Sequence, residues 1–482
     1  MGKAKGLIAV ATSIPPLLKR RDAGRDCPDY QKLCVQSWIG NGFRVVSVNH
    51  PDEIPQLASL HPEVEFVAVE RNASEWTGRR NPYIADLLTA LLEADEPVLG
   101  IINSDLLFEP AAVWGERLPS IVRHSMVIAH RYNARSLSGG SLRQYYGFDC
   151  FFFDKATASR MLDDAMPYAM GVPWWDFWMP CIALLHQRAI MIVDRPALLH
   201  LAHDPAYSAR AWREFAQFFA RSIIRRAENS IDAIPAIITD LLPLFRRIEA
   251  DAAEGRKLGP VTGQLGNTFI SSVRADCVCW PVDTPSVDSG TTNPFARFEE
   301  RAAAGHALGK ARDLAAAGKW LEIGPEIVAA LAKLPEDADA VLTLGEISFH
   351  LGDLDSAKAQ LAEAARLAPE AVFPLQMQGR LLARTGRIDQ ALDCFRQAIA
   401  RDPDYQPAYA ATAKLLWQTG AKRKALTFLE EAVASHPQFS TAAQLCSSYR
   451  EQLQAGVRGR MFRFLKRIRS SIAAKRPSCL ES

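Results

Sequence analysis

The sequence lacks any run that approaches about 18 consecutive apolar residues, the length that a membrane-spanning helix needs. The apolar run at residues 6–12 is short and soon meets two prolines and three basic residues. A first β-strand is therefore favoured over a signal peptide. The net charge of +2 over 482 residues gives no strong excess of either sign that would define a class of partner.

The spacing of the cysteines does not match a zinc-binding motif. The nine cysteines are odd in number and scattered, and Cys277 and Cys279 are their only close pair in sequence. Because no second pair follows at zinc-site spacing, ordinary reduced thiols are favoured over a metal site. Reduced thiols together with the missing apolar run predict a cytoplasmic protein.

The length of 482 residues predicts two or three domains. We place an α/β domain at residues 1–254 and a linker at 255–300, where Gly, Pro, Ser and Thr are frequent. A repeat domain is expected at 301–455, followed by a basic tail at 456–482.

Strand and helix patterns alternate in the N-terminal part of the chain. Short apolar runs at 7–12, 43–49, 65–70 and 98–102 predict strands, and helical patterns cover 29–40 and 81–92. This alternation predicts a mostly parallel sheet with helices on both faces. Further strands are expected at 126–130 and 190–193, a mobile glycine-rich loop at 133–140, and helices at 209–227 and 231–253.

The stretch from Val98 to Phe108 carries the strongest chemical signal. A strand buried on both faces ends at Ile102, and Asn103 and Asp105 follow at once. A buried strand delivers such residues to the carboxyl edge of the sheet, where open α/β sheets bind ligands. A carboxylate there is costly to desolvate without a partner, so Asp105 is a candidate ligand for a divalent ion. The alternative is an Asp that is solvated or caps a helix.

The segment Asn103-Ser104-Asp105 resembles the Asp-X-Asp motif of GT-A glycosyltransferases, with Asn103 in place of the first Asp. In that family the motif also follows a hydrophobic strand, and it binds Mn or Mg together with the diphosphate of a sugar nucleotide. The resemblance implies that Asp105 and Asn103 hold Mn or Mg and contribute to donor binding. It also implies that a His late in the domain completes the metal site, with His203 first and His200 second.

Two aromatic clusters surround further carboxylates. Asp149 lies within the run from Tyr145 to Phe153, where it is either paired in the core or directed into a cleft. Asp176 lies among three tryptophans, an apolar setting that raises a carboxylate pKa and suits a general base. Asp176 also resembles the catalytic base of GT-A enzymes, and Asp149 is the second candidate. The alternative for Asp176 is a helix cap beside core tryptophans.

The remaining donor-binding candidates are Thr12, Ser13, Asn49 and Asn81. Thr12 and Ser13 are expected at the carboxyl end of the first strand, where a nucleotide base could lie.

Residues of the same type recur every 34 residues in the C-terminal part of the chain. This period is typical of a two-helix repeat. The glycines at this spacing are Gly318, Gly352, Gly386 and Gly420, and the prolines are Pro335, Pro369, Pro403 and Pro437. A small residue recurs in register with a large apolar one, which predicts pairs of closely packed helices with a Gly turn and a closing Pro.

This pattern matches the tetratricopeptide repeat, with a degenerate first copy in which Pro325 falls early in the second helix. A capping helix is expected at 441–454. The groove of such a solenoid predicts a protein partner.

The tail from 456 onward carries eight Lys and Arg residues, and its only acid is Glu481. Its apolar residues fall on one helical face, which predicts peripheral contact with an anionic membrane or, as readily, a solvated tail. Nucleic acid is not expected as a partner, because no binding fold accompanies the charge.

The leading interpretation is a metal-dependent glycosyltransferase that moves a sugar from a nucleotide-diphosphate donor to a protein or glycan acceptor. The competing interpretation is a scaffold whose α/β domain is catalytically silent, and Asn103 in place of Asp favours it. A nucleotidyltransferase ranks third, since the N-terminal region lacks a glycine-rich, lysine-bearing phosphate loop.

Overall fold

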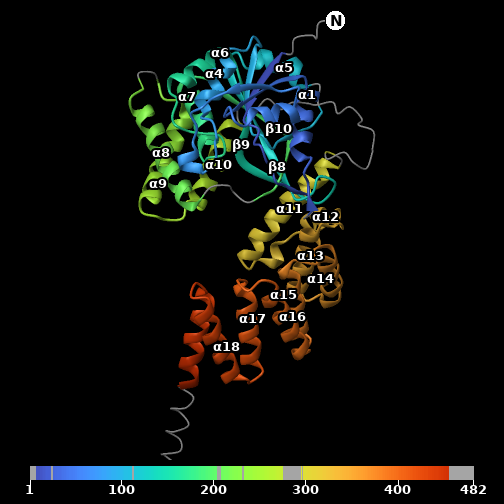
Figure 1. The fold of residues 1–482 in the computed structure, drawn as a ribbon. Coiled ribbons are helices and arrows are strands. Elements are labelled where there is room, and N and C mark those ends of the chain that lie inside the picture. The colour runs from blue at the N-terminus through green and yellow to red at the C-terminus, as the bar shows by residue number, and fades with distance from the viewer. Residues whose placement is uncertain are drawn as a thin grey trace, which may run out of the picture. The chain divides into compact units, whose positions relative to one another are not determined.

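The structure is a computed structural model that describes residues 7–22, 25–110, 113–203, 208–230, 233–274, 295 and 297–454. It divides into two compact units, Met1–His306 and Ala307–Ser482. The first contains a twisted sheet with flanking helices, and the second is helical (Figure 1). The division therefore lies later in the chain than the predicted end of the α/β domain at 254.

A mixed sheet of eight strands organises the first unit. Its order is β5-β4-β1-β6-β9-β8-β10-β7, and six strands run in one direction while β9 and β7 run in the other. The predicted α/β class is therefore confirmed for this unit, with a sheet that is mixed and mostly parallel. The strands are β1 Ile8–Thr12, β4 Phe43–Asn49, β5 Glu65–Ala68, β6 Val98–Ile102, β7 Leu107–Phe108, β8 Ser125–Ala134, β9 Leu142–Phe153 and β10 Ala189–Leu201, and a separate hairpin pairs β2 Arg21–Asp22 with β3 Arg25–Asp26.

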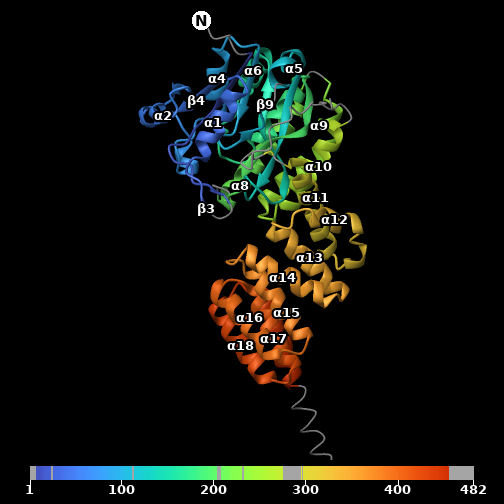
Figure 2. The ribbon, with the colours of Figure 1, turned by 90° about the vertical axis from the view of Figure 1, so that its right-hand side faces the viewer.

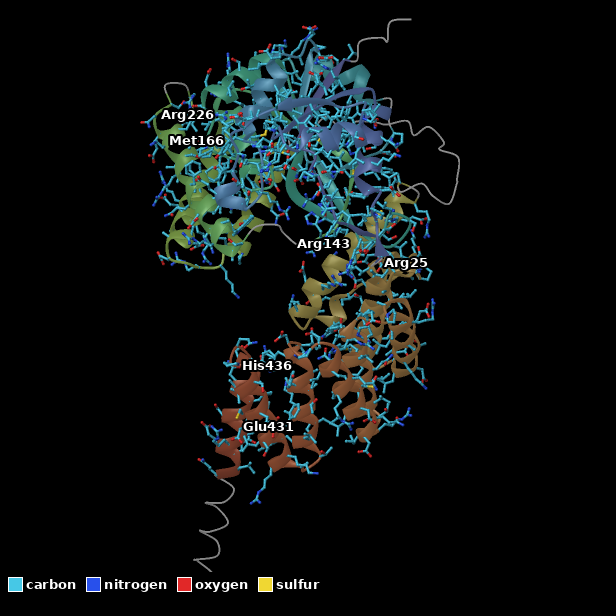
Figure 3. The ribbon with its side chains drawn as sticks, in the orientation of Figure 1. Arg25, Arg143, Met166, Arg226, Glu431 and His436 are labelled. Atoms are coloured by element: carbon cyan, nitrogen blue, oxygen red, sulfur yellow. The ribbon has the colours of Figure 1, made fainter. Side chains whose placement is uncertain are left out.

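The sheet is buried on both faces, as the continuous apolar strands require. Ile8 and Val10 of β1 enter one core, whereas Ala9 and Ala11 enter the other. Helices lie on both sides of the strands (Figure 2), and side chains fill the space between them (Figure 3). The helices of this part are α1 Tyr30–Gly40, α2 Ile54–Leu60, α3 Ser74–Thr77, α4 Ile84–Leu92, α5 Val113–Ile121, α6 Lys155–Asp163 and α7 Trp175–Leu185.

Three further helices complete the core on one face: α8 Ala209–Glu228, α9 Ala236–Ala253 and α10 Gly259–Arg274. α10 lies in the first part of the segment that was predicted to be a linker. This part is helical because Val261, Leu265 and Phe269 form an apolar stripe that packs into the core. The glycines and threonines of this segment obscured that stripe in the sequence. The rest of the expected linker, including Cys277 and Cys279, lies almost wholly outside the described residues.

The loop between β8 and β9, predicted to be mobile, is held by a distant arginine. The guanidinium of Arg301, a residue only 2% exposed, donates to the carbonyl oxygens of Ser136, Leu137, Gly139 and Gly140. A buried cation needs such acceptors. Because Arg301 is so far from this loop in the chain, local composition gives no sign of the contact.

The second unit consists of helix pairs that follow the period seen in the sequence. The four glycines at the turns have positive φ angles of 72°, 90°, 78° and 88°, a conformation that favours glycine. In the degenerate first copy, Pro325 is the first residue of its helix, a position that tolerates proline. The pairs are α11 Phe298–Ala316, whose first residues belong to the first unit, with α12 Pro325–Ala332, α13 Ala338–Leu351 with α14 Leu354–Leu367, α15 Val372–Arg384 with α16 Ile388–Arg401, and α17 Gln406–Gln418 with α18 Lys422–Ser435.

Residues 440–454 form a further helix, as expected for a cap. The basic tail at 456–482 lies outside the described residues. Among the helices that are described, none is long and apolar enough to cross a membrane.

The close approach of paired helices predicts a sharp difference between two glycines of this unit. A Cβ on Gly379 would lie 2.5 Å from the ring of Phe395, whereas one on Gly309 would meet nothing within 4 Å. We expect Gly379→Ala to lower the free energy of unfolding by about 1–3 kcal/mol through overpacking. Gly309→Ala should raise it by about 0.5–1 kcal/mol through helix propensity. Denaturant unfolding measures both, and equal effects would contradict the packing argument.

Candidate metal and catalytic site

Two strands bring the central residues together. Asp105 follows β6, and the short strand β7 just after it pairs antiparallel with β10 at Leu198 and Leu199. This pairing places Asp105 beside His200, which is distant in the chain. The carboxyl edge of the sheet is therefore the location of this site, as the buried strand predicts.

A group of one carboxylate and two imidazoles forms here. Asp105 Oδ2 lies 3.1 Å from His200 Nε2 and 3.3 Å from His203 Nε2, and the three candidate ligand atoms all lie within 4.8 Å of one another. Asp105 and His200 are buried, whereas the side chain of His203 is 31% exposed. The group is thus accessible from solvent on the His203 side. Among the described residues this is the one such group of three or more potential ligands.

Asn133 orients His200. Its Oδ1 lies 2.9 Å from His200 Nδ1, and Asp105 Oδ2 lies 3.1 Å from His200 Nε2, so both ring nitrogens have a partner and the orientation of the ring is fixed. A polar partner on the second ring nitrogen is the arrangement that metal-binding histidines use. Two imidazoles and a carboxylate suit Mn better than Mg, because Mg prefers oxygen ligands and retained water.

Asp105 is charged despite its burial. Burial alone would raise its pKa, but His200, His203 and Arg20 outweigh that effect and hold the pKa of Asp105 well below its usual value. Arg20 Nη2 donates to Asp105 Oδ2 at 2.5 Å. The hydroxyl of Tyr30 donates to the backbone carbonyl of Asp105 at 2.9 Å and fixes the main chain.

Asp149 is paired rather than free. Arg131 Nη1 lies 2.8 Å from its Oδ2, and the side-chain amide of Asn103 donates to its Oδ1. The backbone N–H of Asn103 also donates to the carbonyl of Asp149, which extends the β6–β9 ladder by one residue. The amide of Asn103 is thus directed to Asp149 rather than to the two histidines. Burial is the main reason that the pKa of Asp149 is raised.

Asp176 lies in the first turn of α7 and interacts electrostatically with Asp149 and Arg131. Burial raises its pKa to about 7, with Asp149 adding to the rise and Arg131 opposing it. The backbone N–H groups of Phe177 and Asp176 oppose part of this rise in the pKa. The residue at the N-cap of α7 is Trp174, so Asp176 lies in the first turn and does not cap the helix, and its role as a general base stays a prediction.

The backbone immediately before α7 is strained. Trp174 has a φ of 78°, which is rare for a bulky side chain, and it is the residue at the N-cap of the helix. Its indole donates to the carbonyl of Trp212 at 3.0 Å and stacks on Phe219 with a centroid distance of 5.3 Å. These contacts hold the turn that positions Asp176.

The four other donor-binding candidates come from other segments of the first unit, and two of them have structural partners of their own. Asn49 is buried and its amide donates to the carbonyl of Ile14 at 2.9 Å, and the amide of Asn81 donates to the carbonyl of Met170. Both side chains therefore tie the backbone together. Thr12 is buried at the end of β1, and Ser13 is partly exposed after it.

Sequence reasoning missed Arg20, Arg131, Asn133 and Tyr30. Arg131 and Asn133 lie close together on β8, where polar side chains interrupt an apolar strand, and that interruption was a usable signal. Arg20 and Tyr30 come from the segment after β1, and nothing local marks them as partners of Asp105.

Two segments of the second unit match the tetratricopeptide repeat family, residues 338–370 and 382–449. The predicted repeats are therefore confirmed. No curated protein sequence matches the chain.

Several solved structures are similar to part of the chain. A tetratricopeptide repeat protein of Thermus thermophilus is 21% identical over 30% of this chain and 82% of its own, with a TM-score of 0.26. MamA is 18% identical over 37% of this chain and 98% of its own, also at 0.26. A mutant O-GlcNAc transferase of Thermobaculum terrenum is 18% identical over 28% of this chain and 27% of its own, again at 0.26. At these scores the similarities carry no argument about activity.

The raised pKa of Asp176 predicts a pH-dependent stability effect. In the unfolded chain this carboxyl ionises near its ordinary pKa, and in the folded chain near 7, so folding loses stability as pH rises through that window. We expect Asp176→Asn to raise the free energy of unfolding by about 2–4 kcal/mol at pH 8 and much less at pH 4.

Thermal unfolding at both pH values measures this, with Asp163→Asn at the exposed end of α6 as the matched control. An Asp176→Asn protein that is no more stable than wild type at pH 8 would show that the carboxylate carries no burial penalty.

Proposed function

We propose that the first unit is a metal-dependent glycosyltransferase that uses a nucleotide-diphosphate sugar, and that the repeats bind a protein partner. The observation that carries the proposal is the Asp105–His200–His203 group at the carboxyl edge of an α/β sheet. Asp176, whose pKa is about 7, interacts electrostatically with Asp149, which in turn interacts with Asp105 and His200. The resemblance of Asn103-Ser104-Asp105 to the GT-A motif adds the class of donor.

Asp105, His200 and His203 would hold the metal, and Mn fits these donors better than Mg. When bound, such an ion neutralises the charge that develops on a departing diphosphate. Arg20 already contacts Asp105 and adds a second positive charge at the same place. His203 is the more exposed of the two imidazoles and so lies on the side from which a donor enters.

Asp176 is the proposed general base. Its carboxylate would accept the proton of the acceptor hydroxyl while the oxygen forms a bond to the anomeric carbon and the bond to the diphosphate breaks. A pKa of about 7 matches proton transfer near neutral pH. Asp149 is less suited, because Arg131 and Asn103 already occupy its two oxygens. Its negative charge helps keep the pKa of Asp176 high.

The competing scaffold function has specific observations in its favour. Both family matches are tetratricopeptide repeats, and Asn103 contributes no charge where the GT-A motif carries an Asp. In that case the polar cluster would only stabilise the sheet edge.

A donor screen tests the transferase. We expect slow release of free nucleotide diphosphate from one sugar nucleotide in the presence of Mn, more than with Mg, and loss of that release in Asp105→Ala. Asp52→Ala, which removes an exposed carboxylate outside the group, should behave as wild type. Absence of both hydrolysis and donor-induced thermal stabilisation with every nucleotide would favour the scaffold.

The base assignment gives a separate kinetic prediction. Asp176→Asn should reduce turnover by about 100- to 10,000-fold, because proton transfer from the acceptor is lost. Nucleotide and Mn binding, measured by calorimetry, should remain within a few-fold of wild type, since Asp176 is outside the metal group. Wild-type turnover should fall below pH 7 as Asp176 becomes protonated. An unchanged turnover in Asp176→Asn would leave Asp149 as the remaining candidate.

A further inference from the structure

The repeat unit contains a cavity of about 720 Å³ between α15 and α17, the first helices of consecutive repeats. Its walls carry three cationic side chains and no carboxylate among the described residues. Phe395, Ile388 and Leu415 supply part of the apolar lining. The polar residues in this lining include Gln376, Arg380, Arg384, Gln406 and Lys414.

Two amide side chains in this cavity have their oxygens already bonded. Gln376 Oε1 accepts from the hydroxyl of Tyr405 at 2.6 Å, and Gln406 Oε1 accepts from the backbone N–H of Thr441 at 2.7 Å. The N–H of Thr441 can only donate, so the orientation of the Gln406 amide is fixed. What these two side chains still offer a ligand is their NH₂ groups. Together with Arg and Lys, the cavity presents hydrogen-bond donors, which suit a carboxylate.

The repeat period explains how the charges are arranged. Arg312, Glu346, Arg380 and Lys414 share one spacing and so occupy the same position in four consecutive repeats. Burial raises the pKa of Glu346, and Arg380 and Arg312 on the two sides of it oppose that rise. The charges in this series alternate from Arg312 through Glu346 to Arg380. The alternation then stops, because the next member, Lys414, is a second cation. Neighbouring helices are about 8–10 Å apart, so a ligand carboxylate between these two cations would continue the alternation.

Arg384 belongs to the same site but also supports the fold. It donates to the carbonyl of Phe349 at the end of α13, and both Arg380 and Arg384 lie 5.0 Å from the Phe349 ring centre. Lys414 is exposed. It is therefore the cleaner residue to change.

We infer that this cavity binds an extended acidic peptide segment of a partner protein, with a carboxylate between Arg380 and Lys414. This rests on the proposed protein-binding role of the repeats and is independent of the transferase. Charge complementarity also excludes the basic C-terminal segment of the same chain as the occupant.

The test uses fluorescence anisotropy with the full chain and a fluorescein-labelled peptide of six alternating Glu and Ala residues, with its C-terminus either free or amidated. We expect both forms to bind, with binding weakened at least tenfold by Lys414→Glu and by raising the salt from 50 to 500 mM. Lys358→Glu, the same charge change on α14 outside the cavity, should leave binding unchanged.

Other outcomes are decisive in different ways. A Gln-for-Glu peptide that binds as well as the acidic one, and is insensitive to Lys414→Glu, would overturn the acidic assignment while leaving a protein-binding role. A poly-dT oligonucleotide that displaces the peptide at equal charge concentration would overturn the assignment to a peptide. No binding of the acidic peptide to the wild-type chain at 0.1 mM would overturn the inference, and it would leave the proposed protein-binding role of the repeats in place, because that role does not depend on an acidic ligand.

Discussion

The burial of one carboxylate is the constraint on which the first unit depends. Asp105 lies at the end of a strand enclosed on both faces, and an unpaired charge in that position would cost several kcal/mol. Oδ2 of this residue is met by Arg20, His200 and His203, which come from the segment after β1 and from the end of β10. The folded topology is therefore what makes the charge tolerable, and the same convergence of side chains forms the candidate metal site.

Two further carboxylates, Asp149 and Asp176, have different hydrogen-bond partners although both are buried. Asp149 and Asp176 are both desolvated, yet Asp149 has Arg131 and Asn103 while Asp176 is bonded by backbone donors of its own helix turn. Two buried acids close together resist simultaneous ionisation, and the charge of Asp149 adds to the effect of burial in raising the pKa of Asp176. The strained turn at Trp174, just before Asp176, persists because the hydrogen bond to Trp212 and the stacking on Phe219 hold it.

Local signals in the sequence predicted the elements, but not the partners of the buried charges. The strand before Asp105, the aromatic setting of Asp176 and the histidines near 200 all carried such signals. The structure brings Asp105 and the two histidines to one edge of the sheet, and Asp176 lies where it interacts with the charge of Asp149. Arg20, Arg131 and Arg301 could not be predicted as partners, since each acts on residues that are distant in the chain or on another strand. The helix α10 was missed because Gly and Thr hid an apolar stripe at helical spacing. Side-chain pairing across a sheet depends on register, and a single sequence does not give it.

The repeat unit differs because its contacts are local and periodic. Each helix packs against its neighbour in sequence, so the repeat period already states which residues share a position. That period alone matches Gly345 and Gly379 to Leu361 and Phe395, and the close contacts follow this register. The same register aligns Glu346, Arg380 and Lys414, so a break in charge alternation is visible in the sequence itself.

The period does not show which atoms of the glutamine amides in the cavity remain free for a ligand. The amide oxygens are bonded by Tyr405 and Thr441, and the residues one period before these two are of other types. An amide can present either an acceptor or a donor, and only its bonded partner decides which one remains for a ligand. The donor character of the groove is thus a property of the folded chain, whereas the position of its charges is a property of the repeat.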